Sequence, residues 1–312
     1  MTEIASGKIL HRALSKEASR EVREVGGPAL REVEDECTRV FERCSASARG
    51  TDEHIGLLFP FLQLAELLDS AEVSLAEAST VGASVILRAA LESLLTVEWV
   101  GADASMRYGA AYVVTDIHRR IAGLEQFLPS GTRRKQREAS MRADALGADI
   151  ELPTLPDAQE RIDGFRELLK EQHLAAAAEE YARRRKGGGK VEFFSLWDGP
   201  RGIEQLALKL NRGGQYDFLY RSWSRLVHSA DVMRQLTSSE GSAAVQAFRS
   251  GEGLSDSYTF AIAFGLDGMR VVLGRYRPDE LAKSYPEWYK VHISNALRRL
   301  STAKASSGSP AS

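Results

Sequence analysis

VGASVILRAALESLLTVEWV, residues 81–100, is the most apolar stretch of the chain. A helical wheel places apolar side chains on nearly every side of it, and its charged residues are Arg88, Glu92 and Glu98. A helix that is apolar all round is normally buried, either in a protein core or in a membrane. The length suits a membrane span, but each charged residue near the bilayer centre costs roughly 2.5 to 3.5 kcal/mol on insertion scales. We therefore expect a central helix of a globular protein and no membrane partner.

Helical periodicity extends outward from this segment in both directions. The stretch that follows Pro28 repeats apolar residues every three or four positions, and residues 216–238 and 257–276 also have helical patterns. No internal repeat and no sustained heptad pattern is present. The sequence predicts an all-α fold, a multi-helix bundle of roughly eight to ten helices with flexible N- and C-terminal ends. We expect the 81–100 helix at its centre and the 216–238 helix packed against it.

Prolines and glycines indicate where these helices end. Pro60 predicts a kink or a helix boundary because proline lacks the backbone N–H and clashes with the preceding turn. One long helix is predicted over residues 158–186, ending at the three glycines 187–189. The short aromatic run 190–202 is expected to form an ordered loop or a single short strand.

The expected domain organisation follows from these elements. Residues 1–27 are predicted to form an N-terminal arm, and residues 28–303 a single helical domain with a subdivision near residue 150 as an alternative. Residues 304–312 have the composition of a disordered tail.

Composition excludes several classes of protein. The 312 residues are 43% hydrophobic and 27% charged with a formal net charge of -2, which is typical neither of a disordered polyelectrolyte nor of a strongly basic nucleic-acid coat. Cys37 and Cys44 lie on one predicted helix, roughly 10 Å apart and beyond disulfide reach. Reduced thiols and an N-terminus without an apolar secretory run favour a cytoplasmic protein.

The sequence lacks the common catalytic and cofactor-binding motifs. It contains no H-E-x-x-H, C-x-x-C, G-x-S-x-G or G-x-G-x-x-G, and KGGGK differs from a phosphate-binding P-loop in its spacing and final residue. Glu171 and His173 are two positions apart and point to different helix faces, unlike the Glu-x-x-His pairs of di-iron bundles. We expect no cofactor and no metal.

Arg88 and Glu92 are the first candidate site residues. They are four positions apart and share one face of the apolar helix, where charged groups need partners. A buried arginine–glutamate pair can fix the register of two helices, although its net stabilisation is often small. The same pair can also orient a reacting group. Both interpretations stay open at the level of sequence.

A second polar cluster lies in YRSWSRLVHSAD, residues 220–231. Arg221, Arg225 and His228 form a polar stripe opposite the apolar stripe that contains Trp223. If only the Trp223 face packs, the polar stripe is solvated. Alternatively, it lines a cleft or a dimer seam with His228 as the proton carrier and an arginine as the fixed positive charge.

Three motifs in order resemble a bacterial family of all-helical domains of unknown function. The family pattern is an R-x-x-x-E in an apolar helix, a W-x-G before a short helix, and a Y-x-x-x-S-x-x-x-H helix. The matching residues are Arg88 and Glu92, Trp197 and Gly199, and Tyr220, Ser224 and His228. The resemblance covers about residues 55–240 and implies no assigned activity. We expect Arg88, Glu92, Trp197, Tyr220 and Ser224 to form a polar network.

A more remote similarity is to the HEPN superfamily of helical ribonucleases and nucleotide-binding proteins. Its signature is an arginine followed after four to six residues by a histidine, which Arg221 and His228 match. The similarity implies a metal-independent ribonuclease with His228 as general acid or base and Arg221 stabilising charge on the phosphorane. Sites in that superfamily are completed by a second copy of the chain, which implies a homodimer.

Two basic segments are candidates for phosphate contacts. These are RRKQR at residues 133–137 and RRRKGGGK at residues 183–190, where glycines allow close approach of the backbone to a ligand. Arg184, Arg185 and Lys190 are the candidate phosphate-binding residues. Such segments are also common as solvated helix ends, and this alternative stays open.

The sequence therefore supports two hypotheses of function. The first is a non-catalytic interaction or nucleotide-binding module built around the buried polar network. The alternative is the HEPN-like endoribonuclease, with a role in phage defence or a toxin system. RNA, a nucleotide and a second copy of the chain are the candidate partners, and the sequence names no other protein partner.

Overall fold

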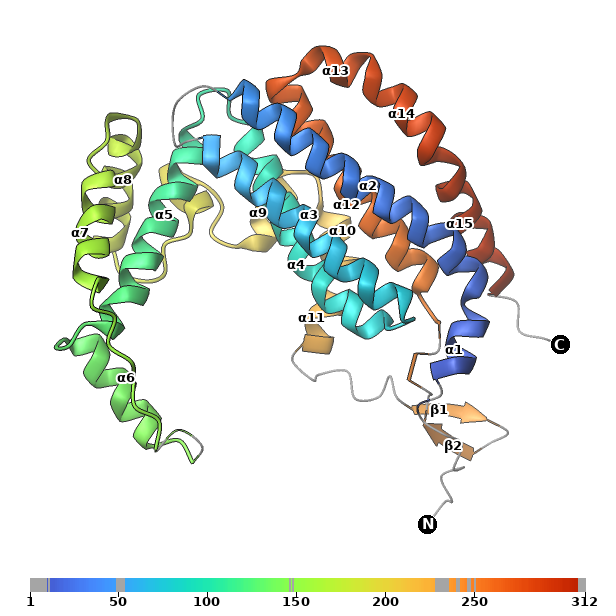
Figure 1. The fold of residues 1–312 in the computed structure, drawn as a ribbon, viewed down its shortest axis with the longest axis horizontal. Coiled ribbons are helices and arrows are strands. Elements are labelled where there is room, and N and C mark those ends of the chain that lie inside the picture. Colours follow the sequence, from blue (N-terminus) through green and yellow to red (C-terminus); the bar gives the residue numbers. More distant parts are fainter. Residues whose placement is uncertain are drawn as a thin grey trace. The chain divides into compact units, whose positions relative to one another are not determined.

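The computed structural model describes residues 10, 12–48, 54–145, 147, 149–227, 236–239, 242–245, 248–249 and 251–307. This part of the chain is mostly helical (Figure 1). One antiparallel hairpin is also present, in which β1 (Leu236–Ser239) pairs with β2 (Ser242–Val245) and Leu236 lies opposite Val245. The predicted all-α class is confirmed, with this short hairpin as an addition.

The chain divides into two compact units. Unit 1 contains Met1–Arg49, Leu57–Ala102 and Ile203–Ser312, and unit 2 contains Gly50–Gly56 and Asp103–Gly202. The boundary near residue 102 directly follows a helix that ends at Gly101, and the boundary near residue 202 directly precedes a helix that begins at Ile203. Residue 150, the alternative subdivision point within the single helical domain expected from the sequence, lies in a connecting loop inside unit 2.

Unit 1 is built around α12, which packs against both α2 and α4. Its helices are α1 (Arg12–Ala18), α2 (Arg20–Ser47), α3 (Ile55–Ala76), α4 (Thr80–Gly101), α9 (Ile203–Lys209), α10 (Gly213–Gln215), the π-helical turn η4 (Tyr216–Tyr220), α11 (Arg221–Val227), α12 (Leu254–Tyr276), α13 (Pro278–Ala282), α14 (Ser284–His292) and α15 (Ser294–Ser307). The approach of α12 to α2 requires a small residue, since a Cβ at Gly265 would lie 2.3 Å from Cγ1 of Val33. This close packing makes the core dense.

Helix α4 has the central position in unit 1 that its sequence predicts. It packs against α12, α9, α11 and η4, and Leu87, Leu91 and Leu94 are fully buried. Among the described helices, α4 alone is long and apolar enough to cross a membrane, but half of its most apolar window is buried inside the protein. Burial against other helices is typical of a core helix.

Unit 2 is a smaller helical assembly around α5 (Arg107–Leu124). Its other elements are the 3-10 turn η2 (Glu125–Phe127), α6 (Thr132–Arg142), α7 (Ala158–Leu168), α8 (Gln172–Lys186) and the 3-10 turn η3 (Phe193–Asp198). Val114 of α5, Ile162 of α7 and Leu174 of α8 are fully buried in one apolar cluster. Residues 193–198 thus form a 3-10 turn, which agrees with the expected ordered loop and excludes a strand there.

Both ends of the chain have more helix than the sequence indicates. Helix α2 begins at Arg20, so the second part of the expected arm is helical, and Gly26 packs directly under the ring of Tyr258. Pro28 lies inside α2 and Pro60 inside α3, which continues past it to Ala76. Pro60 occupies only the second turn, where one backbone hydrogen bond is lost. At the other end α15 continues to Ser307, and residues 308–312 lie outside the described part.

Two predicted long helices are divided in the structure. The helix expected over residues 158–186 is two helices, α7 and α8, separated by a turn at residues 169–171. The break lets both helices contact α5. The helix expected over residues 216–238 consists of η4 and α11 up to Val227, and Leu236–Ser239 is a strand. Helix α8 does end at Lys186, directly before the predicted glycines.

Candidate functional site

Four of the sequence candidates form a hydrogen-bonded polar network within unit 1. Arg88 of α4 donates from Nε to Oγ of Ser224 over 2.9 Å and from Nη2 to Oη of Tyr220 over 2.6 Å. The Tyr220 hydroxyl in turn donates to Oε1 of Glu92 over 2.9 Å. Arg88 and Glu92 also form an ion pair of 3.2 Å between Nη2 and Oε1. Two segments that are more than 120 residues apart are joined by these contacts.

Local helix geometry explains why the four side chains meet. Arg88 and Glu92 are one turn apart on α4 and therefore share a face. Tyr220 ends the π-helical turn η4, and Ser224 follows one turn later in α11. Helices α4 and α11 are packed together, so the two polar faces lie opposite each other. The network consequently fixes the register between these helices.

The network is less buried than the sequence suggests. The side chains of Arg88 and Glu92 are 24% and 41% exposed, which corrects the expectation of a buried ion pair. Arg88 and Glu92 are partly exposed because α11 and η4 cover them from one side only, and Glu92 reaches the surface. Burial, the hydrogen bond to Glu92 and the charge of Glu92 raise the pKa of Tyr220 to about 12. Tyr220 is therefore protonated at neutral pH and can donate its hydrogen bond.

Aromatic contacts continue the network toward the surface. The guanidinium of Arg88 lies 4.4 Å from the centroid of the Tyr220 ring, in cation–π geometry. The rings of Tyr216 and Tyr220 stack at 4.9 Å with an interplanar angle of 16°. Arg221 lies 5.2 Å from the centroid of the Tyr216 ring. Tyrosine rings and guanidinium groups thus alternate along η4 and the start of α11.

A surface cavity of about 520 Å³ lies beside this network. We call it the tyrosine cavity, and its lining is formed by Tyr216, Asp217, Tyr220, Arg221, Ser222, Ser224 and Arg225. Arg221 pairs with Glu204 at 2.7 Å and with Asp217 at 3.0 Å. Within the described residues no carboxylate pairs with Arg225. The cavity therefore offers hydroxyl groups, aromatic rings and one guanidinium, that of Arg225, without a carboxylate partner among the described residues.

Two sequence candidates are not part of this arrangement. His228 lies outside the described residues, so its position relative to Arg221 stays a prediction. Trp197 belongs to unit 2, where its backbone N–H donates to Oε1 of Glu180 over 3.0 Å and its ring lies 6.3 Å from that of Tyr108. Its backbone has a left-handed φ of 51°, which turns the chain sharply at this point. Its role in the structure is to shape this turn and pack within unit 2.

A family model described as "Family of unknown function (DUF5677)" matches residues 54–243. This is more than half of the chain. The chain belongs to the DUF5677 family. The matched region includes all four residues of the polar network and the whole lining of the tyrosine cavity. Neither the curated proteins nor the solved structures provide a significant match.

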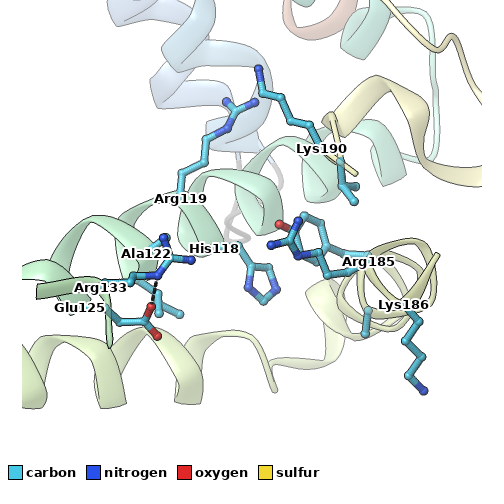
Figure 2. Close-up of a pocket in the computed structure, with 12 residues that line it drawn as sticks. His118, Arg119, Ala122, Glu125, Arg133, Arg185, Lys186 and Lys190 are labelled. Carbon is cyan, nitrogen blue, oxygen red and sulfur yellow. Dashed lines mark ion pairs between the residues drawn. The ribbon is translucent and has the colours of Figure 1, made fainter. Parts of the chain in front are cut away.

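The DUF5677 region contains a second surface cavity, which lies entirely in unit 2 (Figure 2). This basic cavity has a volume of about 560 Å³ and is lined by His118, Arg119, Ile121, Ala122, Glu125, Arg133, Tyr181, Ala182, Arg185, Lys186, Lys190 and Val191. It includes Arg185 and Lys190, two of the three phosphate-binding candidates. The third, Arg184, does not line it, because Arg184 pairs with Glu180 and with Asp198.

Sequence reasoning missed His118, Arg119 and Tyr181, which come from the centres of two helices. The imidazole of His118 stacks on the Tyr181 ring at 4.0 Å and 7°. Burial and the nearby charge of Arg185 lower the pKa of His118. No pattern in the sequence pairs these residues, since α5 and α8 are joined only in the fold. In the part of the DUF5677 chain that the structure describes, no group of three or more His, Cys, Asp or Glu residues is placed to hold a metal ion.

Proposed function

We propose that this DUF5677 protein is a non-catalytic nucleotide-binding module whose site is the tyrosine cavity. The observation that carries this proposal is the combination of stacked tyrosines with Arg225, which has no described carboxylate partner. The Arg221 guanidinium, which lies on the Tyr216 ring and lines the cavity, provides a planar surface on which a base can stack. Arg225 provides the guanidinium that phosphates prefer, and the hydroxyls of Ser222 and Ser224 are hydrogen-bonding groups for the sugar or phosphate.

The binding role is favoured over catalysis because the other charged groups are already compensated. Arg221 is held by Glu204 and Asp217, and the donors of Arg88 are directed at Ser224, Tyr220 and Glu92. A guanidinium that stabilises a developing phosphorane charge must be aimed at the reacting phosphate. In this protein the polar network keeps the cavity wall in place, and no carboxylate of the described residues holds Arg225, which can therefore contact the ligand.

The HEPN-like ribonuclease is the second candidate, and one observation favours it. Arg221, the arginine of the proposed Arg–His signature, lines a cavity large enough for a nucleotide. This mechanism needs no metal. His228 transfers the proton, and Arg221 leaves its carboxylate partners when RNA binds. It also calls for a second copy of the chain to complete the site.

A nucleotide titration tests the primary proposal. ATP and GTP should raise the melting temperature of the wild-type protein, because a ligand that binds only the folded state stabilises it by mass action. Arg225→Gln should weaken nucleotide binding on the order of tenfold, as expected for loss of a charge-assisted hydrogen bond. Arg20→Gln removes the same charge from an exposed side chain of α2 and serves as the matched control. Equal binding by the Arg225 variant and the wild type would refute the site.

An RNA cleavage assay in EDTA separates the two candidates. The nucleotide-binding proposal predicts that the wild-type protein leaves RNA intact. The ribonuclease alternative predicts cleavage that both Arg221→Ala and His228→Ala abolish. Cleavage that is equal in the wild type and both variants would indicate a contaminating nuclease and remove the alternative.

The expected setting of this activity is also part of the proposal. We place the protein in the cytoplasm, where nucleotides are abundant and the thiols of Cys37 and Cys44 stay reduced. A homodimer is the assembly that the ribonuclease alternative requires. Light scattering on the purified protein measures it, and a monomer at all concentrations would count against that alternative.

A further inference from the structure

The basic cavity of unit 2 brings together two basic segments that are about 50 residues apart in the sequence. Arg133 comes from the first turn of α6, and Arg185 and Lys186 come from the last turn of α8. Lys190 follows the three glycines after α8, and Arg119 comes from α5. Figure 2 shows the guanidinium of Arg185 near His118, whereas Arg119 and Lys190 extend away from the ring on one side and Lys186 extends away on the other.

The cavity carries a surplus of positive charge. Five basic side chains line it, and Glu125 is its single lining carboxylate. Arg133 pairs with Glu125 at 2.6 Å, and Glu192 pairs with both Arg119 and Lys190 at 2.6 Å. Arg185 instead donates to the backbone oxygen of Gly189, and within the described chain neither it nor Lys186 has a carboxylate partner. Among the described residues, two carboxylates, Glu125 and Glu192, therefore pair with three of the five cations.

The end of a helix explains only part of this charge. Basic residues at the C-terminus of α8 interact favourably with the helix dipole, which suits Arg185 and Lys186. Arg119 lies in the middle of α5 and Arg133 near the start of α6, where the dipole gives no such stabilisation. Cations gathered from three helices repel one another unless an anion lies between them.

The glycines beside the cavity leave room for a ligand. Gly188 and Gly189 have left-handed φ angles of 79° and 85°, and no atom lies within 4 Å of the position of a Cβ at either residue. The backbone is thus open on this side, so a phosphate group can approach its amides closely. Lys190 continues directly from these glycines into the cavity.

A flat aromatic surface adjoins the cations. His118 and Tyr181 stack face to face and both line the cavity. Proteins that bind single-stranded nucleic acids without sequence preference combine a positively charged groove with aromatic side chains on which bases stack. The positive charge also continues along α6, since Arg137 is exposed one turn after Arg133 and has no described carboxylate partner. An extended row of cations suits a chain of phosphates better than a single phosphate group.

We propose that the basic cavity of unit 2 binds the phosphodiester backbone of a single-stranded nucleic acid. This site is separate from the tyrosine cavity, which belongs to unit 1, and it takes a polymer instead of a free nucleotide. Arg119, Arg133, Arg185 and Lys190 contact the phosphates, and the His118–Tyr181 pair provides the surface for a base. Binding is independent of base sequence because the contacts are to the backbone.

Fluorescence anisotropy with a short labelled oligouridylate tests this proposal on the full-length protein. The double variant Arg185→Gln with Lys190→Gln should weaken binding on the order of tenfold. The slope of log affinity against log salt should fall by about 1.4, since each phosphate contact to a single strand contributes about 0.7. The matched control is Arg166→Gln with Lys170→Gln, which removes one arginine and one lysine that are exposed elsewhere in unit 2. This control should bind like the wild type.

A charge-preserving variant and a set of other ligands show whether weaker binding comes from loss of the site or from disturbance of the fold. Arg185→Lys with Lys190→Arg keeps both charges and should bind within about twofold of the wild type, as expected for a largely electrostatic contact. Oligodeoxyuridylate should bind similarly, and inorganic triphosphate should compete only weakly. Absence of oligouridylate binding, equal binding by the glutamine variant, or tight binding of triphosphate with none of the polymer would each overturn the proposal. Loss of ATP binding by Arg225→Gln leaves this site intact, so the two proposals fail separately.

Discussion

The polar network of unit 1 and the basic cavity of unit 2 use similar residues for different purposes. In the network, the guanidinium of Arg88 is bonded to groups of the same chain, and Glu92 balances its charge. In the basic cavity, Arg185 and Lys186 have no described carboxylate partner. A charged group with all its partners inside the protein stabilises a particular packing. A group of charges without such partners indicates a ligand.

Reversal of the charge of the basic cavity should produce the largest difference between the two sites. Arg185→Glu with Lys190→Glu should reduce oligouridylate binding roughly a hundredfold, because repulsion replaces attraction at two phosphate contacts. ATP binding at the tyrosine cavity should not change. Anisotropy and a nucleotide titration on the same preparation measure both effects. A parallel loss of both activities would mean that the variant disturbs the whole protein and not one site.

Removal of the central cation of the network should affect folding instead of polymer binding. Arg88→Met leaves the Tyr220 hydroxyl without its donor and Glu92 without its cation. Because both groups are partly exposed and can bind water, the loss in the free energy of unfolding should be about 2 kcal/mol, measured by urea denaturation. Arg20→Met, an exposed control on α2, should change stability by about 0.5 kcal/mol or less. A stable Arg88 variant with impaired nucleotide binding would show that the network contacts the ligand.

A smaller effect on stability is expected when the link between Arg88 and Glu92 is removed. Tyr220→Phe deletes the hydroxyl that bonds both residues and should cost about 1 kcal/mol. The pKa of Tyr220 is raised to about 12, whereas the unfolded chain ionises near the ordinary tyrosine pKa of about 10. The stability that Tyr220 contributes is therefore complete below about pH 10 and is lost as the pH rises toward about 12.

Denaturation curves at several alkaline pH values measure this contribution. The wild type should lose stability faster than Tyr220→Phe across this window. Parallel pH profiles for the two proteins would show that Tyr220 titrates normally in the folded state.

The smallest predicted effect concerns protonation in the basic cavity. Burial and Arg185 lower the pKa of His118, so it is mostly neutral at pH 7. A bound phosphate favours the imidazolium, and polymer affinity should thus increase about threefold as the pH falls below the ordinary histidine pKa of about 6.5. The other charged or titratable groups that line the cavity with His118 are Arg119, Glu125, Arg133, Tyr181, Arg185, Lys186 and Lys190.

His118→Gln tests that assignment. It should remove most of the pH dependence of oligouridylate affinity and leave the salt dependence similar. His292→Gln, which changes a half-exposed histidine on α14, is the control and should keep the wild-type pH profile. An unchanged pH profile in the His118 variant would assign the effect to another group.

The central helices of the fold could be predicted from the sequence because their periodicity is strong. Residues 81–100 lie within α4, and the apolar segment 257–276 lies within α12. The divided helices could not be predicted in the same way. Residues 158–186 have helix-forming composition throughout, and the turn between α7 and α8 forms because both helices pack on α5. Tertiary contacts there outweigh local propensity.

The candidate site shows a similar division. Spacing placed Arg88 and Glu92 on one helix face, and the family resemblance added Tyr220 and Ser224 to the expected network. The π-helical turn η4 is not visible in the sequence, yet it adds a residue to the turn that carries Tyr216 and Tyr220. The exposure of Glu92 also depends on which elements cover α4. A polar residue in an apolar helix indicates that a partner exists, and the fold decides how deep the pair lies.

Local sequence patterns are sufficient to predict that this chain is helical, that α4 is its central apolar helix, and which polar residues need partners. These properties depend on side chains a few positions apart, whose relative directions follow from helix geometry. Only the tertiary structure decided that the chain forms two units, that Arg88 is bonded to Tyr220 and Ser224, and that cations from α5, α6 and α8 line one cavity. Contacts between distant segments depend on the packing of many side chains at once, which no local pattern records.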